Sequence, residues 1–261
     1  VAEAYVRGHG APLVVKADGL AAGKGVTVAN SVDEAIAAIR GCLSDGAFGA
    51  AGHKVVVEEF LEGEEASFIC IVGGGRVLAL ASSQDHKARD DADAGPNTGG
   101  MGAYSPAPIV DAAMHARIMR EVIEPTIQGL AKEGIDYTGV LYAGLMIGAD
   151  GVARVIEYNC RLGDPETQPV LMRLQSDIVS LFEAALDGTL SDAMAQWDPR
   201  VALGVVMAAG GYPMAYRGGD AIAGLDDADD GSKVFHAGTR EENGEVLTAG
   251  GRVLCVCALG D

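Results

Sequence analysis

Residues 14–26 read VVKADGLAAGKGV, an apolar strand that contains a lysine and leads directly into a glycine-rich stretch. Lys16 needs a partner of opposite charge in such a strand, because burying an unpaired charge is costly. Glycines let backbone N–H groups approach phosphate oxygens closely. The residues concerned are Gly19, Gly23, Lys24 and Gly25. The stretch lacks the Ser or Thr that follows the lysine of a Walker A loop, so a nucleotide-phosphate site and a plain strand–turn–strand both stay open.

Strand and helix patterns surround this stretch. Ser31 and Glu34 form a capping box that starts a helix, Asp150-Gly151 is a strong hairpin turn, and Pro125 should kink or interrupt a helix. Predicted strands cover residues 12–17, 26–29, 55–60, 67–72, 77–82, 140–147, 152–159, 202–208 and 252–258, and predicted helices cover residues 32–43, 112–132 and 178–186. Residues 84–108 have few periodic apolar positions, and we expect a long loop there, of the kind that is usually either functional or disordered.

The order of these elements predicts an α+β fold with antiparallel hairpins. It lacks the βαβ rhythm of a dinucleotide-binding fold. Three lobes are expected, at residues 1–66, 67–190 and 191–261. Because the chain begins with Val1 and its first residues resemble the end of a helix, we expect it to be a piece of a longer protein.

Composition excludes several classes of protein. The chain has 261 residues, with 19 basic and 37 acidic side chains and a formal net charge of −18, so nucleic acid is not an expected partner. No apolar run approaches the roughly 20 residues of a membrane helix, and no signal peptide is visible, so no membrane partner is expected. The five cysteines have no zinc-site spacing. We expect free, buried thiols in a reducing cytoplasm.

A candidate metal site lies at the end of the predicted strand 152–159. Glu157 and Asn159 are two residues apart, so they share one strand face and offer two hard oxygen ligands for Mg²⁺ or Mn²⁺. If the strand continues, Arg161 places a positive charge just beyond, where it could stabilise a phosphoryl group in transfer. The alternative is a solvated strand edge.

Acidic residues end the predicted strand 55–60. Glu58, Glu59, Phe60 and Leu61 could link two lobes and present backbone groups to an adenine edge, and Glu65 could bind ribose hydroxyls. The alternative is an ordinary acidic strand end.

Two further segments are dense in polar groups. The first contains Asp85 and Lys87, with Pro96, Asn97, Thr98, Gly99 and Gly100, and it could form a lid or an anion-binding nest. A catalytic role for His86 is disfavoured because neighbours on a strand point to opposite faces. The second contains Asp164, Pro165, Glu166 and Thr167, where carboxylates could hold a substrate amine or simply cap a turn before the next helix.

Taken together, these segments resemble the glycinamide ribonucleotide synthetase family of ATP-grasp ligases. The matching stretches are VVKADGLAAGKGV (14–26), VEEFLEGEEASF (57–68), SQDHK (83–87), GPNTGGMGAYSP (95–106), YTGVLYAGLMI (137–147), IEYNCRLGDPETQP (156–169), GVVMAAGGYP (204–213) and GGRVLCV (250–256). They run in order along nearly the whole chain. The lysine–glycine loop and the Glu-x-Asn strand are general to ATP-grasp enzymes, whereas the GPNTGGMGAYSP and NCRLGDPETQP stretches are specific to this family.

The resemblance implies an ATP-grasp fold, with residues 1–66 as lid, 67–190 as catalytic core and 191–261 as a C-terminal domain that is cut short. It implies ATP-dependent ligation of glycine to 5-phosphoribosylamine through glycyl phosphate, in purine biosynthesis, by a cytoplasmic monomer or weak homodimer. Lys16 would contact ATP phosphates under the 19–25 loop, Glu58 to Leu61 would bind adenine, and Glu65 the ribose. Glu157 and Asn159 would hold Mg²⁺ or Mn²⁺.

The resemblance also implies roles for the remaining candidates. Arg161 and Lys16 would be catalytic, while Asp85, Lys87, residues 96–100 and residues 164–167 would face glycine and the ribosyl substrate. The chain departs from the pattern in two ways: no third metal carboxylate precedes Glu157 on the strand before it, and the family's glycine-rich N-terminal domain is missing. The alternatives are another ATP-grasp carboxylate–amine ligase, or an ATP-binding module that does not turn over.

Overall fold

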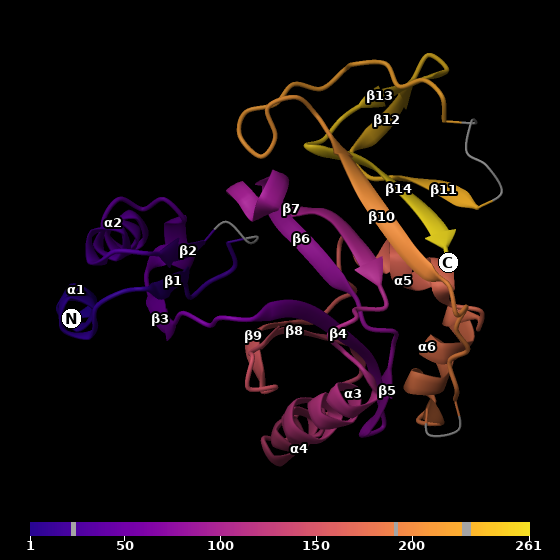
Figure 1. Ribbon diagram of the computed structural model, residues 1–261, viewed down its shortest axis with the longest axis horizontal. Coiled ribbons are helices and arrows are strands. Elements are labelled where there is room, and N and C mark those ends of the chain that lie inside the picture. Colours follow the sequence, from indigo (N-terminus) through magenta and orange to yellow (C-terminus); the bar gives the residue numbers. More distant parts are fainter. Residues whose placement is uncertain (22–24, 191–192, 226–230) are drawn as a thin grey trace. The chain divides into compact units, whose positions relative to one another are not determined.

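The structure, a computed structural model, describes residues 1–21, 25–190, 193–225 and 231–261 (Figure 1). The chain forms two compact units, Val1–Glu62 (unit 1) and Gly63–Asp261 (unit 2). Every strand pair within these described ranges is antiparallel, as the sequence predicts.

Unit 1 packs two helices on a three-stranded sheet. Strand β1 (Leu13–Ala17) lies between β2 (Val26–Ala29) and β3 (Val55–Glu59), with α1 (Ala2–His9), α2 (Val32–Leu43) and a short 3₁₀ turn (Gly49–Gly52). Its core contains Val6, Leu13, Val15, Ala29, Ala35, Ile36 and Ile39. Strand β3 confirms the strand predicted at 55–60; it lies at the sheet edge and is only half-buried.

The predicted cap of α2 forms, with one difference. The N–H of Glu34 donates to Ser31 Oγ at 3.2 Å. The Glu34 carboxylate reaches back one residue further than in a capping box and accepts from the N–H of Asn30 at 2.8 Å.

Unit 2 contains a four-stranded sheet in the order β5-β4-β8-β9. Its strands are β4 (Glu64–Gly73), β5 (Arg76–Ala79), β8 (Gly139–Ile147) and β9 (Ala153–Asn159). Successive residues of β4 point to opposite faces. Phe68, Cys70 and Val72 pack against the helical segment of residues 112–132. Ile69 and Ile71 pack with residues of α5 (Thr167–Arg173) and α6 (Ile178–Leu186). Both faces of the sheet are therefore covered (Figure 1).

The helix predicted at 112–132 is interrupted, one turn before the proline. It consists of α3 (Ala112–Ile118), a π-helical turn (Met119–Ile123) and α4 (Glu124–Lys132), which has Pro125 in its first turn. Pro125 has no N–H, and its ring would collide with the carbonyl of residue 121 in a regular helix. The wider turn, closed by the Glu124 N–H donating to the Met119 carbonyl, accommodates it.

The loop expected at residues 84–108 is instead an irregular hairpin. Strands β6 (Gln84–Asp90) and β7 (Ala94–Ser105) pair with two shifts of register, and a short 3₁₀ turn (Asp91–Asp93) joins them. Strand β7 reads AGPNTGGMGAYS, so glycines take the positions where a strand normally shows apolar alternation. Main-chain pairing with β6 and with residues 202–205 defines the strand, although its composition is not typical of one.

This hairpin belongs to a five-stranded sheet with the order β11-β14-β10-β7-β6. The other strands are β10 (Val201–Ala208), β11 (Ser232–His236) and β14 (Arg252–Gly260), and a separate hairpin pairs β12 (Thr239–Glu242) with β13 (Glu245–Thr248). The sheet takes strands from both sides of residue 190. The predicted boundary between a catalytic core and a C-terminal domain at that residue stays a prediction.

The five cysteines are free. Four are buried as predicted, whereas Cys160 is exposed and corrects that expectation. Within the described part of the chain, no helix is both long enough and apolar enough to span a membrane.

Candidate active site

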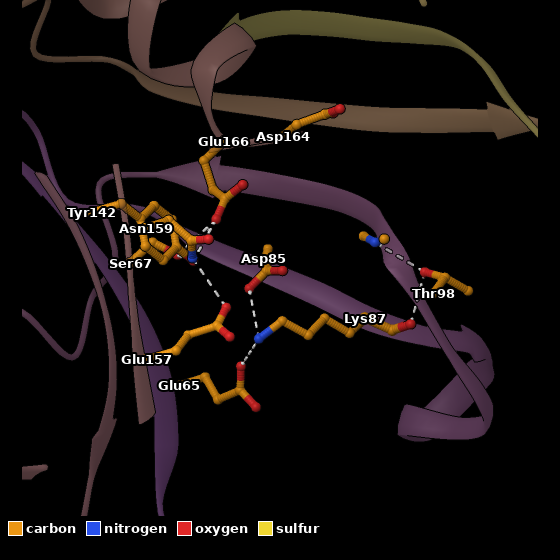
Figure 2. A network of polar contacts seen from close by, with 12 residues as sticks. Glu65, Ser67, Asp85, Lys87, Thr98, Tyr142, Glu157, Asn159, Asp164 and Glu166 are labelled. Atoms are coloured by element: carbon orange, nitrogen blue, oxygen red, sulfur yellow. Dashed lines mark hydrogen bonds and ion pairs between the residues drawn. The ribbon is translucent and has the colours of Figure 1, made fainter. Parts of the chain in front are cut away.

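A cluster of polar side chains lies in unit 2, where β4, β6, β8 and β9 meet the turn that precedes α5 (Figure 2). Its members are Glu65, Ser67, Asp85, Lys87, Tyr142, Glu157, Asn159 and Glu166. Six of the eight were predicted as site residues, and they converge from segments up to about a hundred residues apart. Ser67 and Tyr142 were not predicted.

Lys87 lies among carboxylates. Its ammonium contacts Glu65 Oε2 at 2.5 Å and Asp85 Oδ1 at 3.8 Å. Burial lowers the pKa of Lys87, but the negative charges of Asp85 and Glu65 outweigh it and raise that pKa to about 12. Lys87 is therefore a permanent positive charge in the cluster.

Asp85 has the most perturbed carboxyl group here. Its side chain is 6% exposed. Burial raises the pKa of Asp85 to about 7, with further raising by the charges of Glu166 and Glu65 and partial compensation by Lys87. A group that changes protonation near neutral pH inside a polar cluster is typical of functional sites.

Glu166 is buried beside two hydroxyl groups. It is 2% exposed, and its Oε1 accepts hydrogen bonds from Ser67 Oγ at 2.9 Å and Tyr142 OH at 2.8 Å. The two hydroxyls also contact each other at 2.9 Å. Burial and the nearby Glu166 and Asp85 charges raise the pKa of Tyr142 well above its usual range, so it stays a donor. The turn before α5 thus places one carboxyl group firmly in the cluster.

Removing the hydroxyl of Tyr142 should destabilise unit 2. Tyr142→Phe deletes one of the two donors to a buried carboxyl group, which should lower the free energy of unfolding by about 2 kcal/mol. Trp197, the chain's single tryptophan, packs on the same apolar cluster as Tyr142, so its fluorescence in a urea titration reports unfolding of this part.

The matched control is Tyr158→Phe. The Tyr158 hydroxyl bonds Thr126 Oγ1 at 2.6 Å on the exposed surface. Its loss should change the unfolding free energy by about 0.5 kcal/mol or less, since water replaces the exposed partner. Equal effects of the two substitutions would contradict the role given to the Glu166 network.

Glu157 and Asn159 are side by side at the end of β9, as the strand period predicts. Asn159 Nδ2 donates to Glu157 Oε1 at 3.2 Å, and Glu157 is exposed. A register shift in the β8–β9 pairing lies next to Glu157, between Gly144 and Leu145. Such bulges re-aim side chains beside functional sites.

Arg161 does not continue this strand, which corrects the expectation. Strand β9 ends at Asn159, and Arg161 lies in an exposed bend, where its Nη1 donates to the Leu162 carbonyl at 2.8 Å.

The two predicted substrate segments touch each other through Arg252, a residue that the sequence did not single out. Arg252 donates to the carbonyl oxygens of Gly99 at 2.7 Å and Asp164 at 2.9 Å, and to Asp164 Oδ2 at 2.7 Å. Asp164 is therefore already ion-paired. Pro165 lies against Gly100, where an added Cβ would come within 2.4 Å of Pro165 Cδ.

The remaining members of these segments have local roles. Thr98 Oγ1 donates to the Lys87 carbonyl at 2.8 Å, and Thr167 donates through its N–H and its hydroxyl to the Gly163 carbonyl. Pro96 and Asn97 lie in β7, and Asn97 is exposed opposite Ala88.

Unit 1 holds the predicted phosphate-binding lysine. Lys16 forms an ion pair with Glu58 at 2.7 Å, so the charge partner that the strand requires is present within the chain. The Gly19 N–H donates to the Ala51 carbonyl at 3.0 Å, and an added Cβ there would lie 2.5 Å from Ala51 Cα. Close packing thus explains Gly19 without a ligand.

The other unit 1 candidates lie around these residues. Gly25 accepts from the Ala17 N–H at 2.8 Å. Glu59 ends β3, and Phe60 and Leu61 follow it outside any strand or helix. Gly23 and Lys24 lie outside the described residues.

The comparison with protein families decides the family. Residues 1–167 match the family described as phosphoribosylglycinamide synthetase, ATP-grasp (A) domain. The chain belongs to the phosphoribosylglycinamide synthetase family. Residues 202–261 match the C domain of the same family. The family confirms the ATP-grasp fold that the glycine loop and the Glu-x-Asn strand indicated.

Two curated relatives, from different organisms, carry the same name. The chain is 67% identical over 258 residues to a phosphoribosylamine–glycine ligase of Allochromatium vinosum, and 63% identical over 259 residues to one of Xanthomonas campestris. The two alignments include 98% and 99% of this chain, but only 60% of the length of each relative. The chain thus spans about three fifths of the length of these relatives.

Solved structures agree on the fold. A phosphoribosylamine–glycine ligase from Thermotoga maritima matches with a TM-score of 0.84 at 35% identity, covering 98% of this chain and 63% of that one. A biotin carboxylase from Campylobacter jejuni matches with a TM-score of 0.70 at 15% identity, covering 99% of this chain and 55% of that one, which is a likeness of fold alone.

Proposed function

We propose that the full-length protein ligates glycine to 5-phosphoribosylamine, giving glycinamide ribonucleotide, ADP and phosphate, in purine biosynthesis. One observation carries the proposal: a permanent lysine charge, a buried glutamate and a Glu–Asn oxygen pair lie in one cluster of a synthetase-family chain. In the proposed reaction the glycine carboxylate attacks the γ-phosphate of ATP to form an acyl phosphate, and the amine of phosphoribosylamine then displaces phosphate. The protein mainly positions groups and balances charge.

The oxygen pair fits Mg²⁺ or Mn²⁺. Glu157 offers exposed carboxylate oxygens and Asn159 an amide oxygen, which are the hard ligands that these ions prefer. Among the described residues there is no group of three or more His, Cys, Asp or Glu side chains arranged to hold a metal. Mg²⁺ in nucleotide sites commonly takes one or two protein ligands and completes its shell with phosphate oxygens and water. When bound, the ion would neutralise charge on the phosphates.

Nucleotide binding is assigned to Lys16, the 19–25 loop, residues 58–61 and Glu65. Lys16 now pairs with Glu58 at 2.7 Å, so contact with an ATP phosphate would exchange that partner. Glu65 now accepts from Lys87, so contact with a ribose hydroxyl would exchange that partner.

The substrate side is assigned to Asp85, Lys87, residues 96–100 and residues 164–167. Lys87 supplies positive charge for an anionic substrate group, and the carboxyl groups of Asp85 and Glu166 supply acceptors for an amine. Arg161 is proposed to stabilise the phosphoryl group in transfer. In its bend it is exposed, so its side chain is accessible to a ligand.

Two wider features belong to the proposal. The five free cysteines favour a reducing cytoplasm. The net charge of −18 favours a monomer or weak homodimer, because like charges repel between copies.

The test is phosphate release by the full-length protein with MgATP. Release that requires both glycine and phosphoribosylamine is the expected result. Release that is equally fast with alanine and without phosphoribosylamine would point to another carboxylate–amine ligase and overturn the proposal.

A further inference from the structure

Arg252, at the start of β14, joins two segments that are far apart in the sequence, residues 99–100 and Asp164. Its Nη1 donates to the carbonyl oxygens of Gly99 at 2.7 Å, Gly100 at 3.4 Å and Asp164 at 2.9 Å. Its Nη2 donates to Asp164 Oδ2 at 2.7 Å. The Arg252 side chain is 20% exposed, whereas the Asp164 side chain is 57% exposed, so water reaches the carboxylate end of the ion pair. Hydrogen bonds from an ionised donor are shorter and stronger than those between neutral groups.

Both joined segments lead directly into the polar cluster. From Gly100 the path runs through its N–H, which donates to Thr98 Oγ1 at 3.0 Å, and then from Thr98 to the Lys87 carbonyl at 2.8 Å. Asp164 lies two residues before Glu166 in the chain, and the Glu166 carboxyl group is held by Ser67 and Tyr142. Arg252 therefore fixes the backbone on both sides of the cluster without being a member of it.

The local packing is built around this guanidinium. An added Cβ on Gly99 would lie 3.0 Å from Arg252 Cζ, so the guanidinium would have to shift to make room for it. An added Cβ on Gly100 would lie 2.4 Å from Pro165 Cδ, and that position has no room for a side chain. Tyr212 also holds this segment, because its hydroxyl accepts a hydrogen bond from the Gly99 N–H at 3.1 Å. A planar fork is needed to reach carbonyl and carboxylate oxygens at once, and lysine, with a point charge, lacks that shape.

We propose that Arg252 is a positioning residue for the substrate side of the site: it locks residues 98–100 to residues 164–166 and thereby sets the placement of Lys87 and Glu166. Its enzymatic consequence rests on the function proposed above. Asp164 is then the anchor of this lock and not a ligand of a substrate amine.

The experiment uses the full-length protein with Arg252→Ala, Arg252→Lys and the control Arg154→Ala. Arg154 forms an equally short pair with Asp150, at 2.8 Å, on the exposed β8–β9 turn. Both Arg252 variants should lower kcat/KM for glycine and phosphoribosylamine at least about tenfold and change the KM for MgATP less than about twofold, because Arg252 contacts no residue assigned to the nucleotide. Added guanidinium should restore part of the activity of Arg252→Ala. Arg154→Ala should resemble the wild type in every respect.

A second measurement does not depend on activity. Hydrogen exchange of the peptide covering residues 95–102 should speed up in Arg252→Ala and stay unchanged in Arg154→Ala. If exchange does not change, or if all three KM values change together, the positioning role is wrong. If the wild type releases no phosphate with glycine and phosphoribosylamine, the proposed function fails, and faster exchange confined to Arg252→Ala still supports the lock.

Discussion

Glu157→Gln is expected to lower kcat of the full-length enzyme by about 10²–10³-fold, the size of effect seen when one electrostatic stabiliser of a transition state is removed. The substitution keeps the shape of the side chain and its place beside Asn159, but it removes the only formal negative charge of the oxygen pair. Because Glu157 is exposed at the end of β9, the melting temperature should change little. Steady-state rates measured against Mg²⁺ and Mn²⁺ concentration check this.

The control for Glu157→Gln is Glu133→Gln, which makes the same change of charge at the exposed C-terminal end of α4. That variant should keep wild-type rates. A weakened metal site should also shift the metal concentration for half-maximal rate upward in Glu157→Gln alone. Wild-type kcat at limiting Mg²⁺ in Glu157→Gln would rule out Glu157 as a metal ligand.

The sequence could predict the parts of the fold that have a clear period or turn. The hairpin around Asp150-Gly151, the cap at Ser31 and the helix at 178–186 were all readable, because turn chemistry and apolar spacing act over a few neighbouring residues. Strand β7 could not be predicted from the sequence, because its glycines replace the alternating apolar and polar side chains of an ordinary strand. Its pairing with β10 also connects residues about a hundred positions apart.

The same limit applies to the site. The pair Glu157 and Asn159 follows from the two-residue period of one strand. The partners of Glu166 do not, since Ser67 lies 99 positions away and looks like any polar residue in a buried strand. Arg252 lies 153 positions from Gly99, and only its place within the family-like GGRVLCV stretch hinted at a role.

Asp85 should make the stability of unit 2 depend on pH in an unusual direction. Its pKa is about 7 in the folded chain against an ordinary value of 3.8. Between these values the unfolded chain has lost the proton and the folded chain retains it, so the folded state binds more protons and loses stability as pH rises. The loss is complete above pH 7. Its upper limit is about 4 kcal/mol. A measured value nearer half of that is expected, because relaxation of the surroundings and water penetration reduce the effective cost of burying a charge.

Asp85→Asn removes this titration. Relative to the wild type, the variant should gain about 2–4 kcal/mol in unfolding free energy between pH 4 and pH 8, measured by urea titration of Trp197 fluorescence at several pH values. Taking the difference between the two proteins cancels the other titrating groups. The matched control is Asp150→Asn, because the ion pair with Arg154 lowers the pKa of Asp150 to about 2. That group titrates below the range, so its difference curve should be flat from pH 5 to pH 8. A flat curve for Asp85→Asn as well would mean that Asp85 is charged in the folded protein throughout, and that Lys87 compensates its burial fully.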